Sequence, residues 1–331
     1  MATPTQSRLS LLRRLIPDAF TIGLMLAMLC ATFWPASGAV ARGLGHVTTV
    51  AIGLLFFLHG AKLSGEAVKA GFTHWRLHLL VLTSTFALFP LLGLLLKPFA
   101  LTLITPELYL GILFLCALPS TFQSSIAFTA LARGNVAAAV CSASASNFVG
   151  IFATPVLVGA LVMHGATGQS SLHSIVAFAE QLLLPFVAGQ VARRWIGGFI
   201  DRSRAMLRYV DQGSILLVVY AAFSEAVGEG LWQKLTPAAF VNLGVVSCVL
   251  LALAMLITAW VSRRLGFSKE DQIAIVFCGS KKSMASGVPM AKVLFATSSL
   301  GVLLVPLMLF HQIQLMACAL LAQHYAQRSA A

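Results

Sequence analysis

The chain has 331 residues, of which 59% are hydrophobic and only 10% are charged. Soluble domains carry about 25% charged residues, so this composition excludes an ordinary soluble protein and predicts an all-α polytopic membrane protein. One helical crossing needs about 20 apolar residues, and residues 1–331 therefore allow about ten crossings in a single transmembrane domain. The net charge of +12 is better explained by membrane topology than by a nucleic-acid partner, because phosphate-binding motifs are absent.

Ten apolar runs, separated by polar residues, glycine or proline, follow one another along the chain. A basic segment precedes the first run and resembles a signal peptide, but the run is longer than the about 7 to 15 residues of such a peptide's apolar region. We therefore expect a retained helix. The runs lie at residues 17–35, 44–61, 78–97, 107–132, 136–163, 173–192, 210–227, 238–262, 271–296 and 299–322.

The basic residues are divided unequally between the two sides of these crossings. If the N-terminus is cytoplasmic, sixteen lysines and arginines lie on the inside, and three lie on the outside, namely Arg42, Lys97 and Lys234. Positive residues are enriched in cytoplasmic segments. We therefore expect a multi-pass protein of a bacterial inner membrane with both termini in the cytoplasm.

The polar segment His164–His173 divides the runs into two sets of five, at about residues 12–164 and 172–322. An odd number of crossings inverts the second set, which predicts two inverted five-helix repeats that meet in this segment. The fourth run of each set is interrupted, near Pro119 in the first and near Lys282 in the second. Paired interruptions in inverted halves indicate the binding site of a secondary transporter.

Two adjacent lysines, Lys281 and Lys282, lie about ten residues from the nearer end of the ninth run. A lysine at the centre of a bilayer costs about 2.5 to 3.5 kcal/mol to insert, so we expect a functional role. The charge could replace a coupling cation, bind an anionic substrate or carry a proton, and snorkelling toward a helix end is the structural alternative. Adjacent helical positions point about 100° apart, so only one lysine should face a cavity. The neighbouring candidates are Ser280, Ser283 and Ser286.

A cluster of polar residues follows Pro119, whose ring removes one helical hydrogen bond and frees a carbonyl. Single serines in membrane helices mostly pack or form hydrogen bonds between helices. A cluster beside a break instead predicts the lining of a cavity. The candidates are Ser120, Thr121, Gln123, Ser124 and Ser125.

Polar residues in two further runs complete the candidate site. His311 and Gln314 are three residues apart and therefore share a helix face. Either the two side chains form a structural hydrogen bond across the core, or His311 is a proton-coupling group. Asn147 in the fifth run has two similar alternatives, a hydrogen bond between packed helices or a place in the pocket.

Enzyme and metal signatures are absent from the sequence. The six cysteines lie inside apolar runs without the paired CxxC spacing of metal sites, so we expect packing roles and no cofactor. The chain has no HExxH, GxGD or GxSxG motif, and no acidic residue follows Asp271. These observations argue against an enzyme.

At the two interrupted segments and the Ala132–Val136 turn, the sequence resembles the bile acid:sodium symporter superfamily over nearly the whole chain. A narrower resemblance, to the subfamily that includes the vertebrate solute carrier family ten, member seven, rests on Gly279–Met290 and Phe310–Leu315. The resemblance implies a panel domain (helices 1, 2, 6 and 7) and a core domain (helices 3 to 5 and 8 to 10). It also implies that broken helices 4 and 9 cross in the core.

The resemblance places the family's sodium ligands where this chain mostly differs. The Ser-Asn pair of helix 4 matches Ser124 and Ser125, which are weak sodium candidates, and the glutamine of helix 3 matches Thr85. The carboxylate of helix 9 matches Ser280 and the following glutamine matches Met284. In helix 5 the family's hydroxyls fall on Ala139 and Ala143, whereas this chain has Ser142, Ser144 and Ser146.

These differences predict a secondary active transporter that moves an organic anion by alternating access without the usual two-sodium site. An ammonium about 4 Å from a sodium ion repels it by roughly 4 kcal/mol at an effective dielectric near 20. A sodium-coupled bile acid-type symporter and a non-transporting membrane regulator are the alternatives. The expected partners are the lipid bilayer, a small organic anion, and sodium or a proton as coupling ion.

Overall fold

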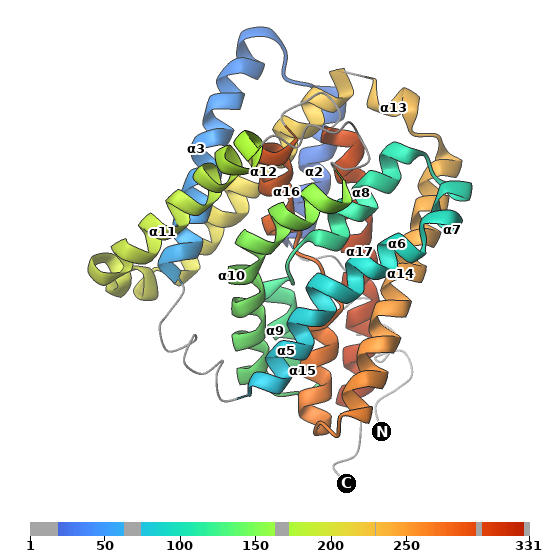
Figure 1. Cartoon of the computed structure of the whole chain (residues 1–331). Helices are drawn as coiled ribbons and strands as arrows, with labels where there is room; N and C mark the ends of the chain where they lie inside the picture. Colours follow the sequence, from blue (N-terminus) through green and yellow to red (C-terminus); the bar gives the residue numbers. More distant parts are fainter. Residues whose placement is uncertain (1–18, 63–73, 163–171, 229, 296–299, 328–331) are drawn as a thin grey trace, which may run out of the picture.

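The computed structural model describes residues 19–62, 74–162, 172–228, 230–295 and 300–327, and every regular element within them is helical (Figure 1). The predicted all-α fold is confirmed. The elements are α2 (Ala19–Phe33), α3 (Gly38–Lys62), α5 (Trp75–Thr83), the π-helix η1 (Ser84–Leu88), α6 (Phe89–Leu95), α7 (Lys97–Leu103), α8 (Pro106–Ala117), α9 (Phe122–Leu131), α10 (Val136–Leu161), α11 (Leu172–Arg202), α12 (Arg204–Gly228), α13 (Leu231–Lys234), α14 (Pro237–Arg264), α15 (Lys269–Gly279), α16 (Met284–Leu294) and α17 (Leu300–Ala326).

Six helical segments in the described part of the chain are long and apolar enough to cross a membrane. α8 and α9 form a seventh if they count as one crossing, although they are bent by 66° at their break. The multi-pass membrane protein is therefore confirmed, while the count of ten crossings stays a prediction. So do the inverted repeats, whose expected junction near residue 168 lies outside the described residues. The six segments are Gly38–Lys62, Trp75–Leu95, Val136–Leu161, Ala205–Gly228, Pro237–Arg264 and Leu300–Ala326.

The helices pack in two groups (Figure 1). α3 packs on α11 and α12, and α2 packs on α12. We call these four helices the panel group. In the core group, α17 packs on α8, α9, α14 and α16, and α15 packs on α5, α9, α10 and α14. This division follows the panel and core arrangement that the family resemblance implies.

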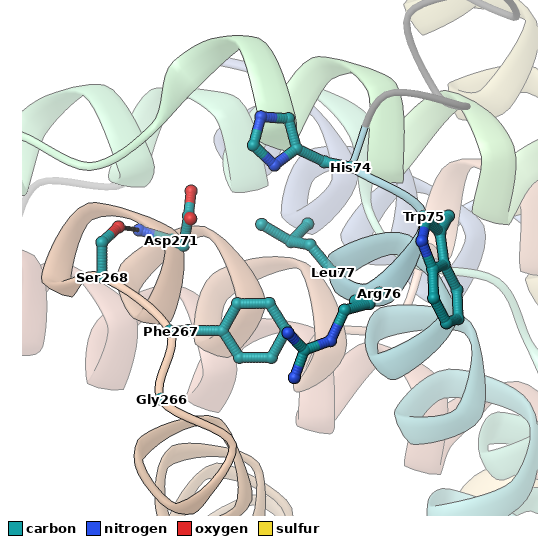
Figure 2. Close-up of a pocket in the computed structure, with 8 residues that line it drawn as sticks. All are labelled: His74, Trp75, Arg76, Leu77, Gly266, Phe267, Ser268 and Asp271. Carbon is teal, nitrogen blue, oxygen red and sulfur yellow. Dashed lines mark hydrogen bonds between the residues drawn. The ribbon is translucent and has the colours of Figure 1, made fainter.

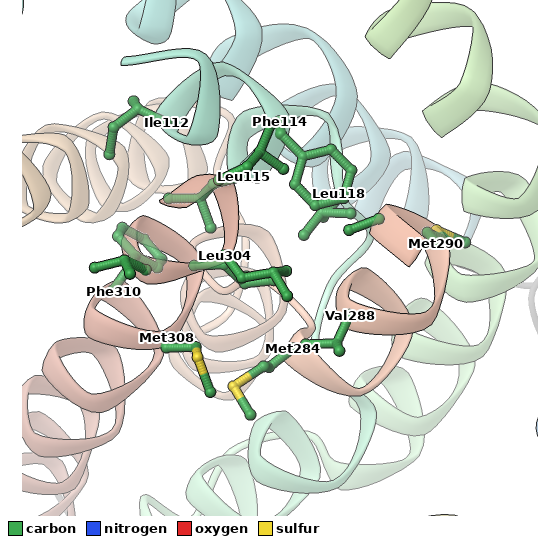
Figure 3. Close-up of a cluster of buried hydrophobic side chains, with 14 of the residues drawn as sticks. Ile112, Phe114, Leu115, Leu118, Met284, Val288, Met290, Leu304, Met308 and Phe310 are labelled. Atoms are coloured by element: carbon green, nitrogen blue, oxygen red, sulfur yellow. The ribbon is translucent and has the colours of Figure 1, made fainter. Parts of the chain in front are cut away.

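Both interruptions expected from the sequence are confirmed. α8 ends at Ala117 and α9 begins at Phe122, while α15 ends at Gly279 and α16 begins at Met284. Buried apolar side chains of α8, α16 and α17 surround the breaks (Figure 3). One apolar cluster therefore surrounds α8 and α16, which are one half of each broken helix.

Glycine is required where α3 and α11 meet. A Cβ atom at Gly60 would overlap the carbonyl oxygen of Phe186, and a Cβ atom at Gly189 would overlap that of Phe57. Small residues let membrane helices approach this closely. Gly53, two turns earlier in α3, has open space around its Cβ position instead, so a methyl group fits at Gly53 but not at Gly60.

We expect Gly60→Ala to lower the thermal unfolding midpoint in detergent, because overpacking typically costs about 1 to 3 kcal/mol. Gly53→Ala on the same helix is the control, and it should leave the midpoint unchanged or raise it, since alanine has about 1 kcal/mol more helix propensity than glycine. Equal midpoints for the two variants would contradict the tight crossing of α3 and α11.

Candidate functional site

The two helix breaks face each other and are joined by hydrogen bonds. The Ser283 N–H donates to the Pro119 carbonyl at 2.8 Å. The Thr121 hydroxyl donates to the Lys282 carbonyl, also at 2.8 Å. Backbone groups freed within a membrane need partners inside the protein, and here each break supplies partners for the other. The two interrupted segments therefore meet at one crossing.

The ammonium of Lys282 lies among three backbone carbonyls. Nζ donates to the carbonyl oxygens of Thr85 at 2.7 Å, Cys116 at 2.8 Å and Leu118 at 2.8 Å. It also lies 4.3 Å from the centre of the Phe89 ring, within the range of a cation–π interaction. The side chain is fully buried. An ammonium has three N–H donors, so each donor of Lys282 has an acceptor.

A π-helical turn explains why the Thr85 carbonyl is available. Pro90 has no N–H and its ring disfavours regular helical geometry in the preceding turn, and the chain forms η1 there. As a result the Phe89 N–H donates to the Ser84 carbonyl, one residue further back than in an α-helix. The Thr85 carbonyl would otherwise accept that N–H. It is released and accepts the ammonium of Lys282 instead.

The carboxyl-terminal end of α8 supplies the other two carbonyls. The last carbonyls of a helix have no intrahelical partner, and the helix end carries partial negative charge that stabilises a cation. Those of Cys116 and Leu118 bind Lys282. The Ala117 carbonyl accepts the hydroxyl of Thr154 at 2.9 Å. Lys282 therefore caps a half-helix that ends inside the protein.

The side-chain amide of Gln314 binds both backbone groups of Lys282. The Lys282 N–H donates to Oε1 at 2.9 Å, and Nε2 donates to the Lys282 carbonyl at 2.9 Å. Nε2 also lies 2.9 Å from Nδ1 of His311. These contacts favour the structural alternative for the pair, because Gln314 binds the broken backbone and His311 contacts the amide of Gln314.

The ammonium of Lys281 lies on the other side of the break. Nζ donates to the Ser124 hydroxyl at 3.2 Å, and lies 4.4 Å from the centre of the Phe128 ring and 5.7 Å from that of Phe277. The side chain is fully buried. Among the described residues, Ser124 is the one hydrogen-bond acceptor that Nζ reaches, so this ammonium has fewer partners than that of Lys282.

The remaining predicted residues near the breaks hold backbone and side-chain groups in place. Ser283 caps α16 by accepting the Ser286 N–H at 3.2 Å, and the Thr85 hydroxyl donates to Val81 within its own helix. The other bonds are Ser120 Oγ to the Cys278 carbonyl (2.5 Å), Ser125 Oγ to the Phe277 carbonyl (3.0 Å), Ser280 Oγ to the Val276 carbonyl (2.6 Å), Asn147 Nδ2 to the Ser120 carbonyl (3.0 Å) and Ser286 Oγ to Asn147 Oδ1 (3.0 Å).

Two residues that the sequence predicted at the site form no hydrogen bond with the described residues of the crossing. Ser142 pairs with His78 of α5, with 2.7 Å between its hydroxyl and Nδ1, and Gln123 is exposed. Sequence reasoning missed Thr154 and the aromatic rings beside the two lysines. It also missed the Thr85 carbonyl, although Pro90 is a sequence signal for a disturbed turn in the residues before it.

Two surface hollows lie apart from the lysines. One, of about 240 Å³, lies between the start of α5 and the turn from α14 to α15, where the Arg76 guanidinium stacks over the Phe267 ring at 5.6 Å (Figure 2). The other, of about 470 Å³, is an apolar groove along α10 and η1 that includes Phe86 and Phe152. Neither is lined by Lys281 or Lys282, both of which are fully buried.

Comparison with known proteins identifies the family of this chain. The profile of the SBF-like CPA transporter family matches residues 18–327. The chain belongs to this family. Among its relatives are the uncharacterised protein PA2026 of Pseudomonas aeruginosa, 63% identical over 95% of both chains, and the putative symporter YfeH of Escherichia coli, 53% identical over 95% of this chain and 94% of the relative. Sodium/bile acid cotransporter 7 of Danio rerio is 30% identical over 93% of both chains.

Family membership confirms the resemblance seen in the sequence. It also confirms that the chain is a transporter-family membrane protein rather than an enzyme.

Two substitutions separate the roles of the adjacent lysines. Lys282→Met should lower the thermal unfolding midpoint, because three buried carbonyls lose their hydrogen-bond donors at a cost of about 1 to 3 kcal/mol each. Removing the buried charge stabilises the folded state, but by less than this cost. Lys281→Met is the matched control. It loses a single hydrogen bond and places a thioether against aromatic rings, which is a favourable contact, so its midpoint should equal or exceed that of the wild type. The reverse order of midpoints would contradict these assignments.

Proposed function

We propose that this protein is a secondary active transporter that moves an organic anion by alternating access and does not use a two-sodium site. The strongest support comes from the Lys282 ammonium, which three backbone carbonyls bind at the crossing of the broken helices. A coupling cation would be expected among such oxygens. In this chain the Lys282 ammonium, which is part of the protein, occupies the position among these oxygens.

Electrostatics supports the absence of sodium coupling. The helix 9 position that carries a carboxylate in sodium-coupled relatives is Ser280 here, and its hydroxyl is bound to the Val276 carbonyl at 2.6 Å. Sodium at the crossing would face the positive charges of Lys281 and Lys282 without a carboxylate to offset them. Because one such charge about 4 Å away repels sodium by roughly 4 kcal/mol, sodium would bind weakly.

Lys281 is our candidate for binding the substrate anion. All three donors of Lys282 already have acceptors, whereas the Lys281 ammonium reaches a single hydroxyl among the described residues. That hydroxyl belongs to Ser124 in the first turn of α9, whose amino-terminal end points at the crossing and carries partial positive charge. The Thr121 side chain does not cap this helix, because it binds the Lys282 carbonyl instead. A carboxylate or sulfate would complete this site.

The proposal extends to topology. We expect ten crossings in a single domain, with both termini in the cytoplasm of a bacterium and two inverted repeats at about residues 12–164 and 172–322. A proton is the coupling ion most compatible with a site built from amines and hydroxyls. The second candidate is a sodium-coupled symporter, favoured by the name of the Danio rerio relative and by the hydroxyls of Ser124 and Ser125.

Ligand-induced stabilisation tests this function even though the substrate is unidentified. A panel of organic carboxylates and sulfates is screened for compounds that raise the thermal midpoint of the purified protein, since a ligand that binds the folded state stabilises it by mass action. We expect hits among anions with an apolar body, no shift with neutral analogues, and loss of the shift in Lys281→Met.

Sodium is the decisive second variable in the same assay. Exchange of sodium for potassium at equal ionic strength should change neither the midpoint nor the response to the anions. Uptake of a hit into proteoliposomes then separates a carrier from a regulator that only binds. A shift or uptake that requires sodium would favour the sodium-coupled alternative.

A further inference from the structure

An ion pair connects the panel group to the core group. Lys292, near the end of α16, donates to the carboxylate of Glu225, near the end of α12, at 2.5 Å. Of the ion pairs between side chains that the structure describes, this one joins the two groups. Two other ion pairs between described side chains lie within the panel group, Lys62 with Asp211 and Arg193 with Asp201 of α11.

The interface around this pair is apolar and closely packed. α12 contacts α16 and α17 here, and a Cβ atom at Gly301 of α17 would overlap Cβ of Ala226, the residue after Glu225. Ala222, one turn earlier on the same face of α12, is completely buried. The ion pair adds a directional contact between two charged side chains to this apolar packing.

The position of the pair at one end of the molecule matters for alternating access. It lies where α12 and α16 end and α17 begins, which is the end opposite to the last turns of α9, α14 and α17 (Figure 1). The predicted topology places this end outside the cell. Side-chain exposures of 27% for Lys292 and 45% for Glu225 show that water reaches the pair, so both charges can be solvated when they separate.

We infer that Glu225 and Lys292 form an outer latch that holds the panel group against the core group while the outside is closed, and that the pair opens to admit substrate. The inference rests on the proposed alternating-access function. The pair acts by positioning the two groups, and it does not touch the crossing. A partly exposed pair is weak enough to break within a transport cycle, yet its loss measurably shifts the balance between the closed and the open state.

A buried reporter cysteine measures that balance directly. Ala222→Cys is introduced after the exposed Cys30 and Cys248 are replaced by serine, and its reaction with a membrane-impermeant maleimide is followed in proteoliposomes. Glu225→Gln and Lys292→Gln should each speed labelling about two- to fivefold, the range expected for loss of an exposed ion pair. The exchanged variant Glu225→Lys with Lys292→Glu restores the attraction and should label at the parent rate.

Asp211→Asn is the matched control, because it breaks an ion pair inside the panel group and should leave the labelling rate unchanged. The latch is disproved if the single variants label at the parent rate, if the control accelerates labelling equally, or if the exchanged variant stays fast. Labelling requires no substrate and no uptake. A protein that binds no organic anion would therefore fail the test of function and could still pass this one.

Discussion

Backbone groups released by a broken helix cannot reach water in the middle of a membrane protein, and the structure of this transporter depends on how those groups are satisfied. Lys282 provides three donors to carbonyls of α8 and η1, and Gln314 binds both the N–H and the carbonyl of Lys282 itself. One residue thus caps the first broken helix with its side chain and is held in the second by its backbone. Removal of either contact leaves buried polar groups without partners.

The two neighbouring lysines have different consequences for function because the break turns them toward different helices. Lys282 points to α8 and η1, where the helix end favours a cation. Lys281 points to the first turns of α9 and to the rings of Phe128 and Phe277. All three donors of Lys282 are bound to carbonyls, whereas the Lys281 ammonium reaches one hydroxyl among the described residues. Both charges at the crossing are therefore part of the protein.

Much of the crossing could be predicted from the sequence, because buried lysines and a proline inside apolar runs have few explanations. The breaks near Pro119 and Lys282, and the shared face of His311 and Gln314, followed from such local signals. The direction of each lysine did not. It depends on the carbonyl that η1 releases in a distant helix and on the angle between α8 and α9, and both arise only when the core is assembled. The pairing of Ser142 with His78 is a tertiary contact of the same kind.

If Lys282 serves as a built-in cation, a free cation should be able to replace its ammonium, and chemical rescue of Lys282→Ala tests this. The variant leaves the carbonyls of Thr85, Cys116 and Leu118 around an unfilled space. Its thermal midpoint is measured in sodium, ammonium and a bulky organic cation at equal ionic strength, beside the wild type. We expect the small cations to raise the midpoint of the variant and to leave that of the wild type unchanged. A variant that responds to no cation, or a wild type that gains as much from sodium as the variant does, would show that Lys282 does not have this role.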